Sequence, residues 1–302
     1  MFDPHAVPVW VFAALFASTL QAFRFYLQKR LATGGLSPAA ATFARFVWAP
    51  PVIGAGLAAW HLGAGDPLPR IPASFWVPAV AGGLAQVLAT VCVVASFAYR
   101  NFAVGIALSK TTVLLTVLAG LVFLGEGVTL LAFAAMVIGF AGVVVLSVPA
   151  DRATWQMTNR GAALGLASGA LFSISAVGYR AASLAIEAEP LMRASLTLCL
   201  VTLLQTSILA AWLILRERGA VTAVFRRWRV SGLVGVTSIL GSLGWFLAYT
   251  LQTAAYVNAV GQVELVLSML ISWLILGERS TPREIAGIVL VGGSVAGLIA
   301  IT

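Results

Sequence analysis

Long apolar segments alternate with short polar connections along the whole chain. Each segment holds about 20 residues, the length that an α-helix needs to cross the hydrocarbon of a bilayer. The pattern therefore predicts an all-α membrane protein with ten transmembrane helices. The predicted segments cover residues 7–28, 38–60, 73–98, 103–124, 129–148, 161–185, 190–215, 231–252, 256–276 and 283–301.

Helix start signals precede several of these segments. Ser37-Pro38 and Glu189-Pro190 place a proline at the first position of a helix, where its missing N–H group is not needed. Thr281-Pro282-Arg283-Glu284 adds a capping box, in which the Thr and Glu side chains bond each other's backbone N–H groups. These signals support the helical interpretation.

The amino-acid composition supports a membrane location. Of the 302 residues, 61% are hydrophobic and only 9% are charged, whereas soluble domains carry about 25% charged residues. So few polar side chains do not cover a surface that faces water. The net charge of +8 comes mostly from Lys and Arg between the apolar segments, where the preference of cytoplasmic loops for cations explains it. We therefore expect contact with the lipid bilayer and no nucleic-acid partner.

The chain lacks the residue patterns that catalysis and cofactor binding need. His5, His61, Cys92 and Cys199 are far apart, without the spacing of a zinc or redox site. No phosphate-binding loop, HExxH motif or nucleophile elbow is present. We expect no metal, no cofactor and no enzymatic activity.

The two halves of the chain resemble each other. A shift of 152 residues places Ala103–Glu126 on Ala255–Glu278 with matching alanines, leucines and a Gly-Glu end. We therefore predict two units, residues 1–150 and 151–302, each a repeat of five helices. Because five is odd, the second copy must enter the membrane in the opposite orientation, which gives an inverted repeat about an axis in the membrane plane.

The repeated motifs resemble those of a known family. Leu124-Gly125-Glu126 and Leu276-Gly277-Glu278 each end a helix that opens with alanines and lead into a Gly-rich terminal helix. In this the chain is similar, over nearly its whole length, to EamA-type transporters of the drug/metabolite transporter superfamily. The resemblance implies a ten-helix secondary transporter or exporter of small metabolites, often amino acids or related compounds. Many members have a proline in the fourth and ninth helices, where this chain has Lys110-Thr111-Thr112 and Gln262-Val263-Glu264, so their substrate contacts do not transfer.

Two charges lie deep inside predicted helices. A charge in the middle of a membrane helix costs about 2.5–3.5 kcal/mol on insertion scales, so each is a functional candidate. Lys110 and Glu264 lie at corresponding depths of the fourth and ninth segments. We predict that they face one central cavity, where they bind a zwitterion or form a pair that substrate or protons break. A permanent structural ion pair is the alternative.

Polar and aromatic residues add to this predicted site. Ser242, Trp245 and Tyr249 share one face of the eighth segment, and Asn258 and Gln262 lie one turn apart in the ninth. Hydrogen bonding between helices, worth about 0.6 kcal/mol per contact, is the alternative role. The predicted substrate-binding or coupling residues are Lys110, Glu264, Gln262, Asn258, Trp245, Tyr249, Tyr99, Ser242 and Thr112.

Other arginines lie nearer the ends of the predicted helices. Arg24 and Arg45 are about two turns from one membrane face, and we expect their long side chains to snorkel to the interface. The alternative is that Arg24 and Arg45 line the cytoplasmic opening of a central cavity. Arg180 and Arg193 are expected to snorkel at the other face. The polar stretch Arg216–Arg229 is expected to lie on the membrane surface, with a simple stop-transfer cluster as the alternative.

Together these patterns predict a secondary active transporter of the inner membrane. We expect it to export an amino acid or a similar zwitterion by alternating access, with protons as a candidate coupling ion. The alternatives are uptake or exchange of an organic anion, or a membrane scaffold without transport activity. The absence of a catalytic constellation speaks against an enzyme. We expect a monomer rather than a dimer.

The distribution of cations predicts the orientation of the chain. The connections after the odd-numbered segments hold twelve Lys and Arg residues, whereas Arg70 is the one cation in the even-numbered connections and at the termini. Loops rich in Lys and Arg stay cytoplasmic, so both termini are predicted in the periplasm, although some members of the superfamily are drawn with both in the cytosol. A C-terminal alkaline-phosphatase fusion should therefore be active, and a fluorescent protein that folds only in the cytoplasm should stay dark. The opposite pattern would show that the orientation is wrong.

Overall fold

A computed structural model of the chain describes residues 8–65, 67–96, 108–147, 160–267 and 281–302. All regular structure within these ranges is helical. Seven helices there are long and apolar enough to cross a membrane, which supports an all-α membrane protein. They are α1 (Val9–Thr33), α4 (Trp76–Ser96, preceded by the 3₁₀ turn Ala73–Phe75), α7 (Leu130–Ser147), α8 (Arg160–Leu184), α9 (Pro190–Arg216), α11 (Trp228–Leu251) and α14 (Pro282–Ala300).

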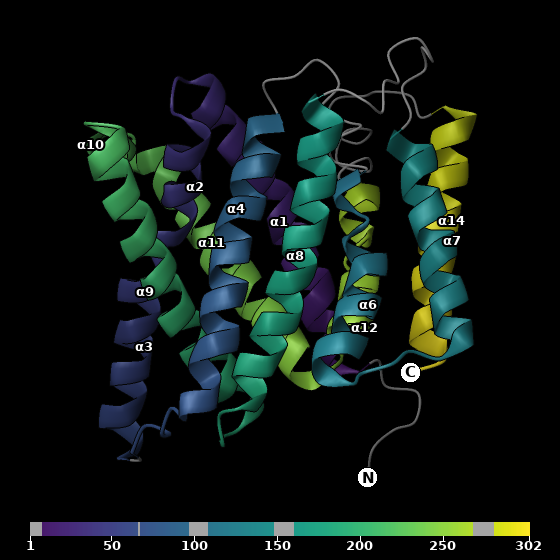
Figure 1. The fold of residues 1–302 in the computed structure, drawn as a ribbon, viewed down its shortest axis with the longest axis horizontal. Helices are drawn as coiled ribbons and strands as arrows, with labels where there is room; N and C mark the ends of the chain where they lie inside the picture. The colour runs from purple at the N-terminus through teal and green to yellow at the C-terminus, as the bar shows by residue number, and fades with distance from the viewer. Residues whose placement is uncertain (1–7, 66, 97–107, 148–159, 268–280) are drawn as a thin grey trace.

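Shorter helices complete the described structure. Figure 1 shows the long helices standing side by side, with the shorter ones between them or at an edge. One short helix, α10, occupies the arginine-rich stretch that the sequence places at a membrane surface, and it lies at the upper edge of the figure. The shorter helices are α2 (Pro38–Phe46), α3 (Ala49–Ala64), α6 (Thr112–Leu124), α10 (Ala220–Arg226) and α12 (Ala254–Val260).

The predicted second segment, 38–60, is two helices instead of one. α2 ends at Phe46 and α3 begins at Ala49. Pro50 and Pro51 explain the interruption, because a proline has no N–H group to donate and its ring clashes with the carbonyl group four residues earlier. For Pro50 that carbonyl belongs to Phe46, where α2 ends.

The predicted start signals operate as expected. The Ser37 hydroxyl accepts a hydrogen bond from the backbone N–H of Ala40 at the start of α2. At the start of α14, the Thr281 hydroxyl accepts from the N–H of Glu284, and the Glu284 carboxylate accepts from the N–H of Thr281. Both halves of the capping box are therefore formed.

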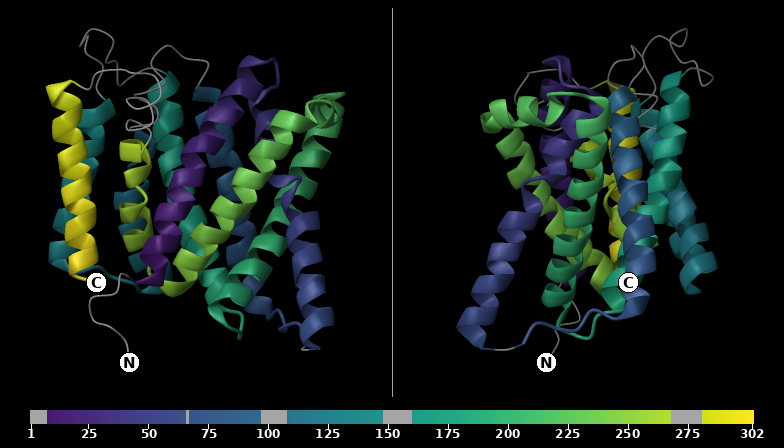
Figure 2. Two further views of the ribbon diagram at one scale, coloured as in Figure 1. Left: turned by 180° about the vertical axis from the view of Figure 1, so that it is seen from behind. Right: turned by 60° about the vertical axis from the view of Figure 1, so that its left-hand side comes forward.

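Six of the long helices pack in three pairs, and each pair joins a helix from residues 1–150 to a helix from residues 151–302. α1 packs along α11, α8 packs along α4, and α7 packs along α14. Figure 1 shows α1 rising from the lower edge and α8 descending from the upper edge. The α7–α14 pair stands at one end of the row in both Figure 1 and Figure 2. The start of α1 and the end of α14 lie at the lower edge, opposite α10.

Glycines allow the closest helix contacts. A Cβ atom on Gly178 of α8 would lie 2.7 Å from the carbonyl oxygen of Pro78 on α4, and one on Gly244 of α11 would lie 2.9 Å from that of Ala13 on α1. Small residues let helix backbones approach within the membrane, where association depends on packing. These contacts bring α1, α4, α8 and α11 together around the centre of the molecule.

This packing predicts a difference between two glycines in long helices. Gly178→Ala should destabilise the protein by about 1–3 kcal/mol, because the added methyl group meets the backbone of α4. Gly232→Ala in α11 is the matched control: nothing lies within 4 Å of its added methyl group, so it should be neutral or stabilise the helix by up to about 1 kcal/mol. Thermal unfolding of the purified variants measures both. Equal melting temperatures would contradict the packing.

Candidate functional site

A cavity of about 90 Å³ lies among α1, α4, α6, α8, α11 and α12. A volume of this size holds several water molecules or a small polar group. Under the 152-residue shift α1 corresponds to α8 and α4 to α11, and α6 and α12 fall in the fourth and ninth predicted segments, which correspond to each other. The cavity therefore lies where the corresponding helices of the two halves meet.

Two of the lining helices are interrupted at equivalent positions. The segment that continues into α6 has a turn at Lys110-Thr111, and α12 ends at Val260 before a turn at Gly261-Gln262. In these turns the N–H of Val113 donates to the carbonyl of Lys110, and the N–H of Leu265 donates to that of Gln262. The two bonds are related by the shift of 152 residues. Each joins residues three apart, which is tighter than the four-residue spacing of an α-helix.

Side chains near the first interruption satisfy the displaced backbone groups. The hydroxyl of Thr111 donates to the carbonyl of Leu108, and that of Thr112 donates to the carbonyls of Ser109 and Gly169. Hydroxyl groups that bond nearby carbonyls in this way compete with the helical pattern. This local competition holds Lys110 at the point where the backbone turns.

Lys110 and Glu264 form an ion pair beside the two interruptions. The Lys110 Nζ lies 2.7 Å from the Glu264 Oε2, and the side chains are 15% and 5% exposed. The 13 residues of α6 extend about 20 Å, so Lys110 lies well inside a hydrocarbon core of about 30 Å. Both residues line the cavity. The structure thus brings together the two deep charges that the sequence singles out.

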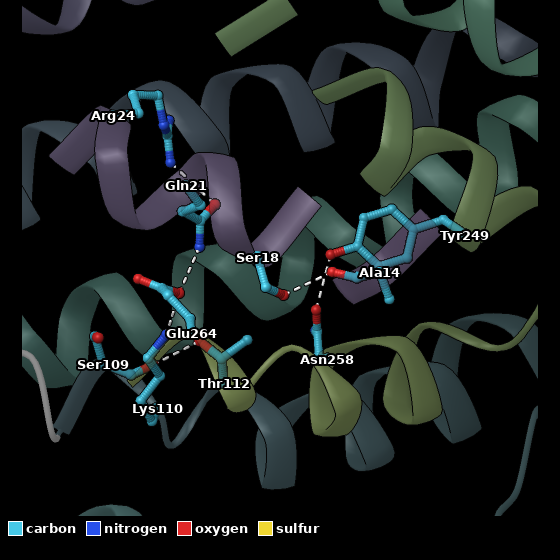
Figure 3. A network of polar contacts seen from close by, with 10 residues as sticks. All are labelled: Ala14, Ser18, Gln21, Arg24, Ser109, Lys110, Thr112, Tyr249, Asn258 and Glu264. Carbon is cyan, nitrogen blue, oxygen red and sulfur yellow. Dashed lines mark hydrogen bonds and ion pairs between the residues drawn. The ribbon is translucent and has the colours of Figure 1, made fainter. Parts of the chain in front are cut away.

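Hydrogen bonds of Gln21 connect the ion pair to Arg24 of α1. Gln21 donates from Nε2 to the Glu264 Oε2 at 2.9 Å, and its Oε1 accepts from Arg24 Nη2 at 2.9 Å. Figure 3 shows this connected series from Arg24 through Gln21 and Glu264 to Lys110. One carboxylate oxygen therefore receives hydrogen bonds from both a lysine and an amide.

Aromatic and amide groups form another wall of the cavity. The Tyr249 hydroxyl donates to Asn258 Oδ1 at 2.7 Å, and Asn258 Nδ2 donates to Thr116 Oγ1 at 2.9 Å. The rings of Trp245 and Tyr249 stack with centroids 5.9 Å apart. Aromatic faces attract cations and also pack against apolar groups. The wall thus offers both polar and apolar contacts.

Most of the predicted site residues meet at this cavity. Gln262 is an exception: it is 1% exposed, it is not among the lining residues, and its Oε1 approaches Gly139 of α7. Tyr99 lies outside the described residues. The role of these residues in substrate binding or coupling stays a prediction. The predicted residues that line the cavity are Lys110, Glu264, Asn258, Trp245, Tyr249, Ser242 and Thr112.

Sequence reasoning missed four polar residues of the cavity. Gln21, Gln86, Ser175 and Tyr179 all line it. The Tyr179 hydroxyl donates to Gln86 Oε1 and accepts from Gln205 Nε2. Uncharged polar side chains in the middle of apolar segments are the signal that would have found them, because such groups need hydrogen-bond partners inside a membrane.

The predicted snorkelling of Arg24 and Arg45 is wrong. Both residues are only 2% exposed. Arg24 donates to Gln21, and Arg45 Nη1 donates to Thr90 Oγ1 at 2.8 Å. Each residue lies on the inward face of its helix, so the guanidinium groups point into the protein and not along it to the interface.

Arg180 also has specific partners. Its Nε lies 2.7 and 2.8 Å from the two carboxylate oxygens of Glu126, and its Nη1 donates to the carbonyls of Tyr249 and Gln252 at 2.7 Å. The glutamate of the first Leu-Gly-Glu motif therefore connects the end of α6 to α8 and α11. In the described ranges, no three His, Cys, Asp or Glu side chains lie close enough together to hold a metal ion.

Comparisons with known proteins show what the chain is similar to. No curated protein matches the chain. A protein solved as a crystal structure is similar with a TM-score of 0.69 and 18% sequence identity, and the match covers 94% of this chain and 95% of that one. At this identity the similarity shows the fold alone. Residues 159–300 match the EamA-like transporter family, so this part of the chain is similar to that family. Together with the seven helices that are long and apolar enough to cross a membrane, the match supports a multi-pass membrane protein.

Proposed function

We propose that this protein is a secondary active transporter that exports a small zwitterion, most simply an amino acid, by alternating access. The observation that carries the proposal is the Lys110–Glu264 ion pair, which lines a cavity beside two helix interruptions at equivalent positions. A buried pair of opposite charges offers a partner for each end of a zwitterion. A purely structural pair needs no adjoining cavity.

Helix interruptions are typical of transport sites. In secondary transporters, discontinuous helices near the bilayer midplane place backbone groups and helix ends against the substrate. The N-terminus of α6, which begins two residues after Lys110, is the positive end of a helix dipole. It therefore favours a negative group in the adjoining cavity, such as the carboxylate of an amino acid.

The packing of helices from one predicted half on helices from the other supports the two-repeat mechanism. α1 packs on α11 and α8 packs on α4, so the first helix of each predicted half contacts the third helix of the other. The opposite directions of α1 and α8 (Figure 1) fit an inverted repeat of residues 1–150 and 151–302. Rocking one repeat against the other would then expose the cavity to each side of the membrane in turn.

The proposed setting is the inner membrane, with both termini in the periplasm. The described ends lie at the face opposite α10, which lies within the arginine-rich stretch (Figure 1), and a face rich in arginine is the cytoplasmic one. The partners are then the small-molecule substrate, the lipid bilayer and protons as the coupling ion. We propose that the functional unit is the monomer, because helices of both predicted halves already meet at the cavity.

Transport of an organic anion is the second candidate function. It is favoured by the two buried arginines, Arg24 and Arg45, which lie beside the cavity. Proteoliposomes that contain the purified chain separate the two candidates: they should take up radiolabelled amino acids by counterflow against an internal amino-acid mixture, and succinate should not compete. Uptake of succinate without amino-acid uptake would replace the first proposal with the second. Empty liposomes measure the background.

Neutralising the ion pair tests the assigned site. Glu264→Gln should abolish flux or its pH dependence while the protein remains folded, because the amide keeps the shape but loses the charge that attracts an ammonium group or carries a proton. Lys110→Met should be as harmful for a substrate with a carboxylate. Glu187→Gln removes an exposed carboxylate and is the control, with flux unchanged.

The double variant decides between the two roles of the pair. If Lys110 and Glu264 only hold helices together, each single change strands a buried charge and destabilises by about 3–5 kcal/mol, and the double change restores stability. The proposal predicts that the double variant stays inactive whatever its melting temperature. Near-normal flux in the double variant would show that the assignment is wrong.

A further inference from the structure

A narrow crevice adjoins the cavity between α1, α2 and α11. Gln21, Ser242 and Trp245 line both the cavity and the crevice, whereas Arg24 and Arg45 line the crevice but not the cavity. The indole of Trp245 separates the two spaces, with one end of its ring against Gly261 at the second helix interruption. The crevice is therefore a continuation of the proposed transport site.

Four buried polar atoms of the residues that line this crevice have no hydrogen-bond partner among the described residues. They are Arg24 Nη1, Arg45 Nε, Ser238 Oγ and Trp245 Nε1. The three nitrogen atoms are donors only, and the hydroxyl group is also able to donate. Arg24, Arg45 and Ser238 are at most 4% exposed. Buried donors that gather in one place fit a group that only accepts hydrogen bonds, and an ionised carboxylate has about four acceptor positions.

The charges at the crevice favour an anion. A guanidinium group keeps its proton in proteins, so Arg24 and Arg45 are both cations. Among the described residues, the ion pairs are Lys110–Glu264 and Arg180–Glu126, and neither includes these two arginines. Two buried cations that repel each other are unfavourable in a medium of low polarity. An anion between them would remove both the repulsion and the unpaired charge.

The side chain of Gln21 shows how a zwitterion would fit. Its amide oxygen accepts from Arg24 and its amide nitrogen donates to Glu264, both at 2.9 Å (Figure 3). An α-amino acid has the same arrangement, with an acceptor at its carboxylate and a donor at its ammonium group a few atoms away. The Gln21 amide thus makes, within the protein, the two contacts that the substrate would make.

We propose that the crevice is the carboxylate subsite of the transport site: Arg24 and Arg45 bind the substrate's carboxylate, Glu264 binds its ammonium group, and Gln21 occupies both positions until the substrate replaces it. The crevice as described is too narrow for a water molecule, and withdrawal of Gln21 widens it. This inference rests on the proposed function and adds to it the requirement for a free carboxylate and the orientation of the substrate: the two arginines, and not Lys110, bind the carboxylate, and Lys110 remains the ion-pair partner of Glu264.

Binding of matched acids and amides tests the subsite. The probes are L-alanine, L-leucine and L-phenylalanine and their primary amides, which keep the ammonium group and side chain but lack the carboxylate. Thermal stabilisation of the full-length protein in lipid nanodiscs gives the apparent affinities. At least one acid should bind at least tenfold more tightly than its amide. Arg24→Gln and Arg45→Gln should each remove this preference, and Arg218→Gln, at an exposed arginine, should keep it.

Several results would overturn the subsite. These are equal binding of acids and amides by the unaltered protein, no stabilisation by any acid, or an unchanged preference in both arginine variants. Stronger stabilisation by inorganic phosphate than by every acid would also overturn it and would identify a phosphate site. Amino-acid flux without a preference for the acid would leave the proposed transport function standing, whereas a preference without flux would refute transport and leave the subsite.

Two further readings separate binding from a structural role. Arg24→Gln should not lower the melting temperature of the ligand-free protein, because it removes one of two cations that repel each other. A structural arginine would lower it. Gln21→Ala should tighten binding of the preferred acid severalfold, because the competing amide is gone. Weaker binding in Gln21→Ala would show that Gln21 contacts the substrate directly and would refute its replacement by the substrate.

Discussion

The ion pair between Lys110 and Glu264 determines how the centre of this protein is built. Each charge alone would cost about 2.5–3.5 kcal/mol inside a bilayer, so the two must meet, and their contact of 2.7 Å requires α6 and the segment after α12 to lie side by side. Both segments turn at that level, at Lys110-Thr111 and at Gly261-Gln262. The turns place polar backbone and charged side chains around one cavity, where irregular backbone is tolerated inside a membrane.

Two further positive charges lie beside the Lys110–Glu264 pair, whose own charges cancel. Arg24 and Arg45 lie beside it, buried, and the Gln21 amide connects Arg24 to Glu264. A protein selected for stability alone would neutralise or remove such groups. Polar groups left without partners are expected where binding or a conformational change supplies the partner. The same few side chains are the reason that we propose a zwitterion or an anion, and not a cation, as the substrate.

Charge and depth were enough to find the pair from the sequence, but not its setting. Lys110 and Glu264 stand out because they are charges deep inside predicted helices, at corresponding depths of the fourth and ninth segments. The burial of Arg24 was not predictable, because distance along a helix does not reveal which face it turns inward. Pro50 and Pro51 are the sequence signal for the break between α2 and α3, which hydropathy alone does not reveal. The turn at Lys110 carries neither proline nor glycine, and it depends on hydroxyl bonds and on contact with Gly169 of α8.

Infrared difference spectroscopy of the carboxylate of Glu264 tests most directly whether the pair belongs to the transport cycle. Spectra of the reconstituted protein would be recorded with and without the amino acid of highest flux, and Glu264→Gln would identify the band. A substrate whose ammonium group replaces the Gln21 contact changes the hydrogen bonding of this carboxylate, so its stretching band should shift on binding and return when the substrate is washed out. A band that stays unchanged at saturating substrate would contradict the account and leave the pair a structural one.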